Sequence, residues 1–132
     1  MTVKNLVLNG TVTRQSPTYS TLTVTGSITG GGTTPTLIMA EGAAFKPNGK
    51  GFLRITESLA PANGTMTVDI GEIDFSAGKA IPLFRVGSAG MLPNTVELVN
   101  GTLPEGWALT RTSDGLGYRI RNRNRQLRLI LR

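Results

Sequence analysis

The stretch Leu6-Val7-Leu8-Asn9-Gly10-Thr11-Val12-Thr13 recurs sixteen residues later as Leu22-Thr23-Val24-Thr25-Gly26-Ser27-Ile28-Thr29, and a weaker third copy is Ile38-Met39-Ala40-Glu41-Gly42-Ala43-Ala44. Each copy places apolar side chains on alternate residues around a glycine, as in a strand that bends and continues. Repetition at a fixed period is typical of stacked units that are individually too small to bury their apolar faces. The repeat therefore predicts a β-solenoid or a sheet of near-identical strands. The repeat positions expected to build it are Leu6, Leu8, Leu22, Val24 and Ile28.

Composition predicts one all-β domain over residues 1–132. The chain is 39% hydrophobic and contains 17 glycines, and its many threonines suit strands better than helices. No segment has apolar residues at helical spacing over three turns, so we expect no helix. A chain of this length holds one modest core.

Cysteine and histidine are both absent. Their absence excludes disulfides, thiol nucleophiles, zinc-cysteine sites and Ser-His catalysis, and it removes the commonest proton shuttle near neutral pH. Carboxylate, lysine or tyrosine chemistry survives this exclusion. We therefore expect a protein that is not an enzyme and that has no cofactor and no metal site.

The repeat is lost beyond about residue 50, and aromatic residues become more frequent there. We interpret residues 1–45 as solenoid rungs and residues 46–132 as a C-terminal β cap, because a solenoid needs an atypical terminal unit to cover its last apolar face. A β-sandwich or a barrel is the alternative fold. Later strands are expected at Phe52–Ile55, Ile81–Val86, Thr95–Val99, Trp107–Thr110, Tyr118–Ile120 and Leu127–Leu131.

A β-bulge is predicted at Gly71. Met66, Val68 and Ile70 share one face of a strand, whereas Ile73 and Phe75 fall on the opposite parity. A slip of one residue at the glycine would return both sets to the core.

The glycine-rich units and the end of the chain resemble passenger regions of autotransporter-like bacterial surface proteins. The residues that carry the resemblance are Leu22–Thr29, Val96–Trp107, Asp114–Tyr118 and Leu127–Leu131, the last three being similar to the close of an autotransporter-associated β-strand repeat region. The resemblance implies a right-handed parallel β-helix that is exported and forms a stalk at the cell surface beside adhesive or other modules. It transfers no catalytic residue.

Because the repeat begins almost at residue 1 without an apolar leader, we expect a piece of a larger extracellular protein with neighbouring domains. No stretch approaches the roughly 20 apolar residues of a spanning helix, so no membrane-spanning segment is expected. Threonine- and glycine-rich β-repeats also occur in phage tail fibres, for which the expected state would be a homotrimer.

Arginine at the C-terminus accounts for the net charge of +6. Six arginines and no acid follow Tyr118, and four of them alternate, which on a strand places them on one face. This face predicts a site for an anionic glycan or nucleic acid. The alternative is a hairpin whose arginines prevent edge-to-edge aggregation. The four alternating residues are Arg119, Arg121, Arg123 and Arg125.

Asp69, Glu72 and Asp74 form the one cluster of acids. They could supply oxygen ligands for Ca²⁺ or a glycosidase pair, and the alternative is that they are solvent-facing residues of a strand. Trp107 is either a platform on which a carbohydrate stacks or a core anchor of the cap.

Three Asn-Gly-Thr triplets begin at Asn9, Asn63 and Asn100. They indicate either glycosylation acceptors or turns, because Asn and Gly both tolerate positive φ. The sequence as a whole favours a non-catalytic structural or adhesive module at the capped end of a stalk. The alternatives are a binding module for an anionic polymer and a fibre segment.

Overall fold

The computed structural model describes residues 2–12 and 21–123, and these form an all-β fold. Three short 3₁₀ turns join the strands, at Ala62–Gly64, Phe75–Ala77 and Ala89–Met91. The strands in the described residues are β1 (Thr2–Leu8), β2 (Thr23–Gly30), β3 (Thr33–Met39), β4 (Ala44–Lys46), β5 (Leu53–Pro61), β6 (Thr65–Asp69), β7 (Ile81–Val86), β8 (Thr95–Val99), β9 (Trp107–Arg111) and β10 (Gly117–Asn122).

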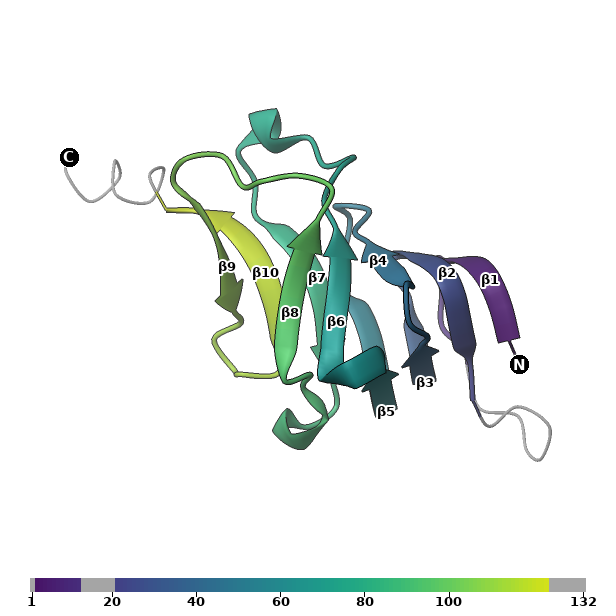
Figure 1. Cartoon of the computed structure of the whole chain (residues 1–132). Coiled ribbons are helices and arrows are strands. Elements are labelled where there is room, and N and C mark those ends of the chain that lie inside the picture. The colour runs from purple at the N-terminus through teal and green to yellow at the C-terminus, as the bar shows by residue number, and fades with distance from the viewer. Residues whose placement is uncertain (1, 13–20, 124–132) are drawn as a thin grey trace.

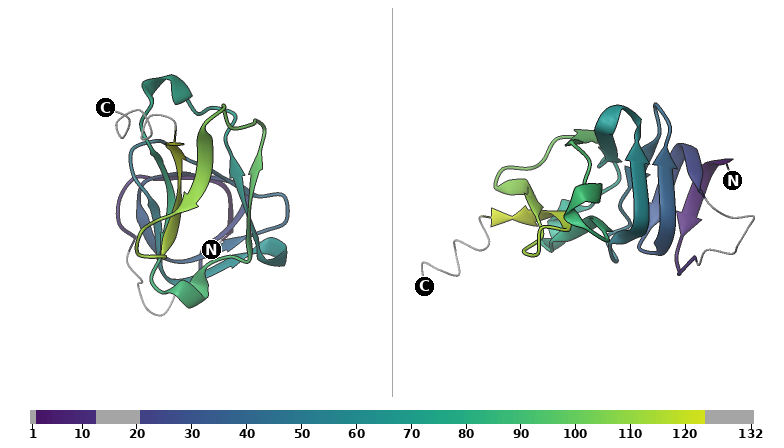
Figure 2. Two further views of the ribbon diagram at one scale, coloured as in Figure 1. Left: turned by 90° about the vertical axis from the view of Figure 1, so that its left-hand side faces the viewer. Right: turned by 90° about the horizontal axis from the view of Figure 1, so that it is seen from below.

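All of these strands belong to one curled sheet (Figures 1 and 2). Its order is β8-β6-β4-β2-β3-β5-β7-β10-β9, and β1 pairs with β2 off this path. Strand β2 is long enough to pair with β3 through its first part and with β4 through its second. Pairing is parallel throughout the sheet except where β10 pairs with β7 and β9. The molecule is therefore parallel from its N-terminal end and antiparallel only at its C-terminal end.

Apolar side chains stack in register from strand to strand. The longest such ladder starts on β1, crosses β2, β4 and β6, and ends on β8. Its members are Leu6, Ile28, Phe45, Val68 and Leu98. A second ladder consists of Val3, Val24, Met39 and Pro61, and a third of Thr34, Ile55 and Val86. Stacking of like side chains lets each strand bury the apolar face of the one before it.

The stacking register differs from the sixteen-residue repeat. Leu6 pairs with Ile28 rather than with Leu22, a step of 22 positions (28 minus 6), and on the other side of the register irregularity Val3 pairs with Val24, a step of 21 (24 minus 3). Side chains on a strand alternate with a period of two, and steps of 16 and 22 therefore place the same residues inside. The repeat indicates which side chains point inward but not which of them are neighbours in the sheet.

The glycine of the second repeat copy lies where β1 and β2 bend together. Their register is irregular between Val3 and Asn5. The Asn5 side-chain oxygen accepts hydrogen bonds from the Ser27 N–H and hydroxyl, both at 3.0 Å. A Cβ at Gly26 would lie 2.8 Å from the Lys4 carbonyl oxygen, so only glycine lets the strands approach here. The prediction of a strand that bends and continues is confirmed for β2.

One apolar cluster runs through the described residues from Leu8 to Ile120. The predicted core positions Leu8, Leu22, Val24 and Ile28 are buried in it, while Leu6 is half-buried against it. Its largest fully buried side chains are Phe45 and Phe84.

The predicted bulge at Gly71 is wrong. Strand β6 ends at Asp69, and the chain turns, with Gly71 N–H donating to the Asp69 carboxylate and Ile73 N–H donating to the Ile70 carbonyl. Ile73 and Phe75 reach the core from outside the strand, where both pack half-buried. A turn that folds the chain back has the same effect on side-chain parity as a bulge, which is why the two are indistinguishable from parity alone.

The later strands agree with the sequence analysis. Strands β7 and β8 have the expected bounds, and β9 and β10 contain the expected segments. Of the segment expected at Phe52–Ile55, residues 53–55 begin the longer β5, and Phe52 precedes it. The segment Leu127–Leu131 lies outside the described residues.

Candidate interaction surfaces

Three of the four alternating arginines lie in the described part of the chain. Arg119 and Arg121 belong to β10, where they pair with Thr110 and Ala108 of β9, and Arg123 follows two residues later. Ile120, between the first two, is fully buried, so its neighbours point away from the core. We call Arg119, Arg121 and Arg123 the arginine strip. Arg125 lies outside the described residues.

Two polar atoms at the arginine strip are buried and have no hydrogen-bond partner among the described residues, namely Arg119 Nε and Thr110 Oγ1. They belong to directly paired residues of β10 and β9. A buried donor without a partner costs free energy that a ligand acceptor can recover. The strip thus combines positive charge, carried by the half-buried Arg119 and Arg121 and the exposed Arg123, with unused hydrogen-bonding capacity.

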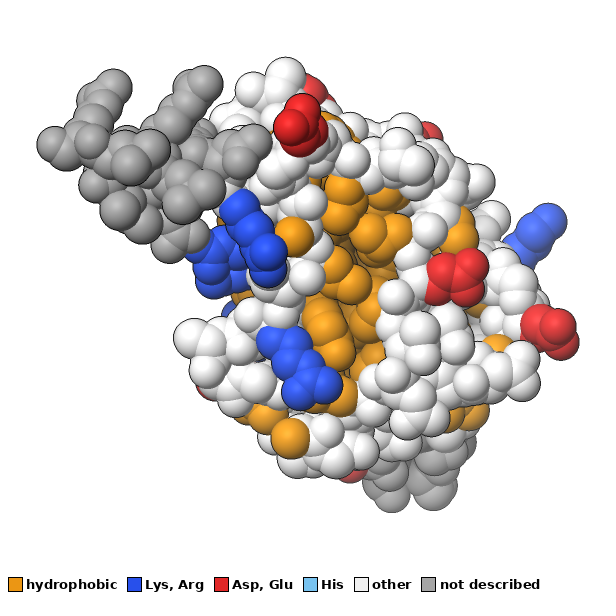
Figure 3. Space-filling model, turned by 60° about the vertical axis from the view of Figure 1, so that its left-hand side comes forward, with side chains coloured by type: hydrophobic (Ala, Val, Ile, Leu, Met, Phe, Trp, Pro, Cys, Tyr) orange, Lys and Arg blue, Asp and Glu red, His pale blue; other side chains and the backbone are white. Residues whose placement is uncertain are grey.

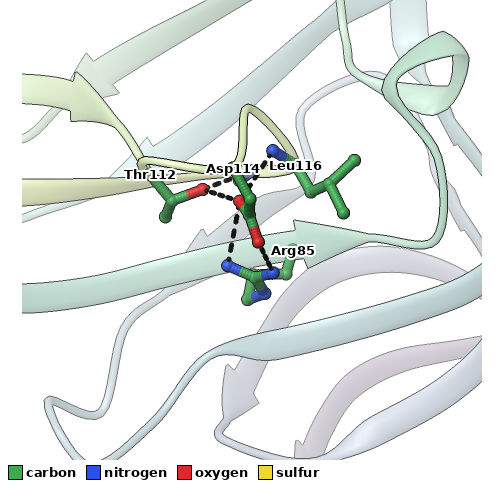
Figure 4. Close-up of polar contacts among 5 residues, drawn as sticks. Arg85, Thr112, Asp114 and Leu116 are labelled. Atoms are coloured by element: carbon green, nitrogen blue, oxygen red, sulfur yellow. Dashed lines mark hydrogen bonds and ion pairs between the residues drawn. The ribbon is translucent and has the colours of Figure 1, made fainter.

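An ion pair fixes the turn between β9 and β10 to β7 (Figure 4). The Asp114 carboxylate accepts from both terminal nitrogens of Arg85, from the Thr112 hydroxyl at 2.6 Å and from Leu116 N–H at 3.1 Å. These hydrogen bonds, that from Arg85 above all, hold the pKa of Asp114 far below its ordinary value. Arg85 and Asp114 lie 29 positions apart, and sequence patterns give no signal for their meeting.

Trp107 begins β9 and packs half-buried against the core. Its ring meets that of Phe75 edge to face, with centroids 5.0 Å apart and planes inclined by 71°. This geometry is the favourable one for aromatic pairs, and it engages part of the indole surface. Trp107 therefore joins the 3₁₀ turn Phe75–Ala77 to the start of β9.

The acidic residues serve mainly as turn caps. Asp69 accepts from Gly71 N–H and from the Asn100 amide at 2.9 Å, and these contacts, first the Gly71 bond, lower its pKa. Asp74 accepts from the Ser76 hydroxyl and N–H, which lower its pKa in the same way. Within the described residues no three acids gather as a metal site would require. Glu72 and Asp74 line a shallow pocket of about 290 Å³ that also contains Lys79.

Two of the Asn-Gly-Thr triplets are turns with positive φ. Asn63 has φ 56° and Asn100 has φ 63°, a conformation that asparagine tolerates better than most residues. The turn at Asn63 connects β5 to β6, which do not pair with each other, so it forms a corner rather than a hairpin. Asn100 has a further role that the sequence did not reveal, since its amide holds Asp69.

An apolar groove lies between the two strands that end the sheet path, β8 and β9 (Figure 3). We define it by half-buried side chains on both strands, Val96, Leu98, Trp107 and Leu109, all of which contact the core. The space-filling view shows apolar side chains gathered in a hollow, with basic groups toward one wall and acidic groups toward the other.

The opposite end of the molecule is also incompletely covered. Val3 and Leu6 of β1 are half-buried, whereas their ladder partners Val24 and Ile28 are both 0% exposed. Among the described residues β1 pairs with β2 alone, and Val7 on the outward face of β1 is 66% exposed. We call this surface the open end.

Comparison of the chain with models of protein families, with curated proteins and with solved structures gives no match. In the part of the chain that the structure describes, no helix has the length and apolar character needed to cross a membrane.

Proposed function

We propose that this chain is a non-catalytic structural module, the closing segment of a three-sided β-solenoid. Three ladders of parallel pairs support this reading. On each side, a strand pairs with the strand that lies about one circuit of the chain earlier. On one side, for example, Leu6 of β1 is followed by Ile28 of β2 and then by Phe45 of β4. The two other sides are built by the ladders of Val24 and Ile55.

The main support for the proposal is that the side chains of β1 are less buried than their ladder partners on β2. Val24 and Ile28 are fully buried because a strand lies on each side of them, while Val3 and Leu6 have, among the described residues, a strand on one side only. A further parallel strand beside β1 would bury both residues and satisfy the free edge of the ladder. The open end is therefore the surface on which an adjoining rung would stack.

The other end has the character of a cap. Strand β10 turns antiparallel beside β7 and is followed across the sheet by β9, so the parallel ladder of the third side stops there. Ile120 and Phe84 are both 0% exposed under this hairpin. Together with the resemblance to autotransporter-like passengers, this polarity favours the end of a surface-exposed stalk with adhesive or other neighbouring domains.

Duplication of one rung tests the proposal. A chain with residues 2–22 inserted a second time ahead of Thr2 should stack the added rung on β1, so β1 amides become protected from hydrogen exchange. The cost of Leu6→Ala at its original rung should then rise toward the 2–5 kcal/mol of a fully buried site. An added rung that exchanges freely, with an unchanged cost of Leu6→Ala, would contradict the proposal.

A second candidate function is binding of an anionic polymer by the arginine strip. Its specific support is the buried Nε of Arg119, which has no hydrogen-bond partner among the described residues and belongs to a face that carries only positive charge. The variant R119S/R121S/R123S should leave a heparin column at lower salt than the wild type, because phosphate- and sulfate-type contacts weaken steeply with salt. The matched control K4S/K50S/K79S removes the same charge elsewhere. If both variants elute at the same salt concentration, binding depends on net charge alone and the arginine strip is not a specific site.

A further inference from the structure

Two arginines lie side by side on the outward face of the sheet. Arg54 of β5 and Arg85 of β7 are direct partners in the parallel pairing of these strands. The residues that flank each of them are buried, so both side chains point away from the core. Neighbouring strands are about 4.8 Å apart, and like charges placed directly opposite each other destabilise a sheet. Violations of such local rules are expected where a site serves a function.

One aromatic ring contacts both guanidinium groups. The Cζ atom of Arg54 lies 5.8 Å from the centroid of the Phe52 ring, and the Cζ atom of Arg85 lies 5.4 Å from the same centroid. Phe52 is half-buried and directly precedes β5. Attraction between the cations and the ring holds the two guanidinium groups close together. A ligand that bridges them therefore meets groups that are already ordered, which lowers the entropic cost of binding.

An acid neutralises only one of the two arginines. Asp114 accepts hydrogen bonds from both terminal nitrogens of Arg85 (Figure 4). Gly117 is the partner of Arg85 on β10, and a Cβ at Gly117 would lie 2.7 Å from Arg85 Cγ, so this glycine leaves room for the arginine side chain. Arg54 is exposed and forms no ion pair with an acid of the described residues. Two positive charges and one negative charge leave the group with one uncompensated positive charge.

We propose that Arg54 and Arg85, held beside the Phe52 ring, bind a singly charged oxyanion, a carboxylate or a sulfate ester. A guanidinium presents its N–H groups as a planar fork that matches two oxygens of such a group. The Arg54 fork has no competing acceptor among the described residues, and Arg85 supplies the second positive charge from a position that Asp114 fixes. A single negative charge balances the site, whereas a second one meets the Asp114 carboxylate.

This oxyanion site is separate from the arginine strip and does not depend on the structural role proposed above. Its test is a titration of the isotope-labelled full chain, followed by NMR at neutral pH and constant ionic strength. The probes are glucuronate, which carries a carboxylate, a glucose sulfate monoester, and neutral glucose. We expect saturable shifts of the Arg54 and Arg85 amide and Nε–H signals with both acids and none with glucose. Shifts that do not saturate, or that neutral glucose also causes, overturn the proposal.

Loss of the free guanidinium gives the first comparison between variants. Arg54→Gln should weaken binding of both acids about tenfold, because it removes a charge-assisted pair of hydrogen bonds. Arg111→Gln is the matched control, since Arg111 is also exposed but contacts Tyr118 outside the site. Equal weakening in the two variants shows an effect of net charge and overturns the proposal. So does unchanged binding in Arg54→Gln.

Removal of the competing acid gives the second comparison. Asp114→Asn should tighten binding roughly threefold or more, because a carboxylate no longer repels the ligand at close range. It should also favour a doubly charged glucose phosphate ester over the sulfate ester, whereas the wild type should not. Circular dichroism checks that this variant is folded, and the Arg54→Gln comparison does not depend on it. Weaker binding by folded Asp114→Asn, or a wild-type preference for the phosphate ester, contradicts the proposal.

The arginine strip is tested separately in the same titration. The variant R119S/R121S/R123S should retain the binding of glucuronate and of the sulfate ester, whether or not it loses binding to heparin. A loss of monosaccharide binding as large as that of Arg54→Gln would overturn the oxyanion site, because the whole basic surface would then act as one.

Discussion

Apolar side chains are buried in different ways by the first strand, β1, and by the hairpin of β9 and β10. At the open end, a parallel strand lies on the stack with half of its ladder uncovered, so that Val3 and Leu6 remain half-buried. At the other end, the chain reverses and an antiparallel hairpin seals Ile120 and Phe84 completely. A parallel strand needs a successor to finish its burial, whereas an antiparallel return finishes it within a few residues. The hairpin closes the side of the sheet on which β7 lies, whereas at the far end of the first ladder Leu98 of β8 is half-buried, as Leu6 is at the open end.

The largest expected differences in stability come from shortening side chains of the ladder that runs from Leu6 to Leu98, once at its middle and once at the open end. Phe45→Ala removes a fully buried ring with strands on both sides and should cost about 3–5 kcal/mol of unfolding free energy. Leu6→Ala lies at the uncovered end and should cost about 1 kcal/mol, because solvent already reaches the side chain. Urea denaturation followed by circular dichroism measures both, and equal costs would mean that the open end is as well packed as the centre.

Glycine substitutions sharpen the comparison near the open end. Gly30 has φ +147°, and a Cβ there would overlap the carbonyl oxygen of Leu8 on β1. Gly30→Ala should therefore cost about 2–3 kcal/mol and disturb the pairing of β1 with β2. Gly42→Ala is the control, since Gly42 has φ +85° with open space around it, and its backbone strain alone should cost about 1 kcal/mol. Thermal denaturation that ranks Gly42→Ala as the more damaging would contradict the close approach of β1 and β2.

At the closing end, acid should weaken the contact of Asp114 with Arg85. The pKa of Asp114 is lowered in the folded protein, so its contribution is complete above the unfolded pKa of 3.8 and is lost as the pH falls toward the folded pKa. Asp114→Asn should therefore be less stable than wild type at pH 7, and the difference in urea midpoint should narrow below about pH 4. A difference that stays constant down to pH 2 would show that the carboxylate charge has no part in holding the hairpin.

The smallest effect is expected at the exposed face of β1. Val7 is 66% exposed, and Val7→Lys should change stability by less than about 0.5 kcal/mol. The measurement is the midpoint of thermal unfolding. A loss of several degrees would mean that this face is covered in solution, for instance by another chain.

Local patterns predicted which residues are inside and where many strands lie. Alternation selected Val24 and Ile28 as core, and turn residues bounded Ile81–Val86 correctly. Pairing was beyond such patterns, because every even shift between strands preserves the inward face. The reversal of the chain after β6 was likewise missed, since a turn and a bulge change parity alike.

Long-range polar contacts were the hardest to predict. Nothing local to Asp114 indicates Arg85 as its partner, and nothing near Asn100 indicates that its amide holds Asp69, 31 positions away. These contacts depend on a register that only the folded sheet defines. The arginines differ, because alternation along one strand is a local property, and Arg119 and Arg121 lie on the outward face as their spacing predicts.

Residue-resolved amide hydrogen exchange on the unmodified chain tests most directly whether β1 is an open strand while the hairpin of β9 and β10 closes the sheet beside β7. Protection should be greatest in β2, β4 and β7, remain high in β10, and fall sharply in β1, whose outer edge has no partner strand among the described residues. Protection of β1 equal to that of β4, or free exchange of β10, would contradict this polarity.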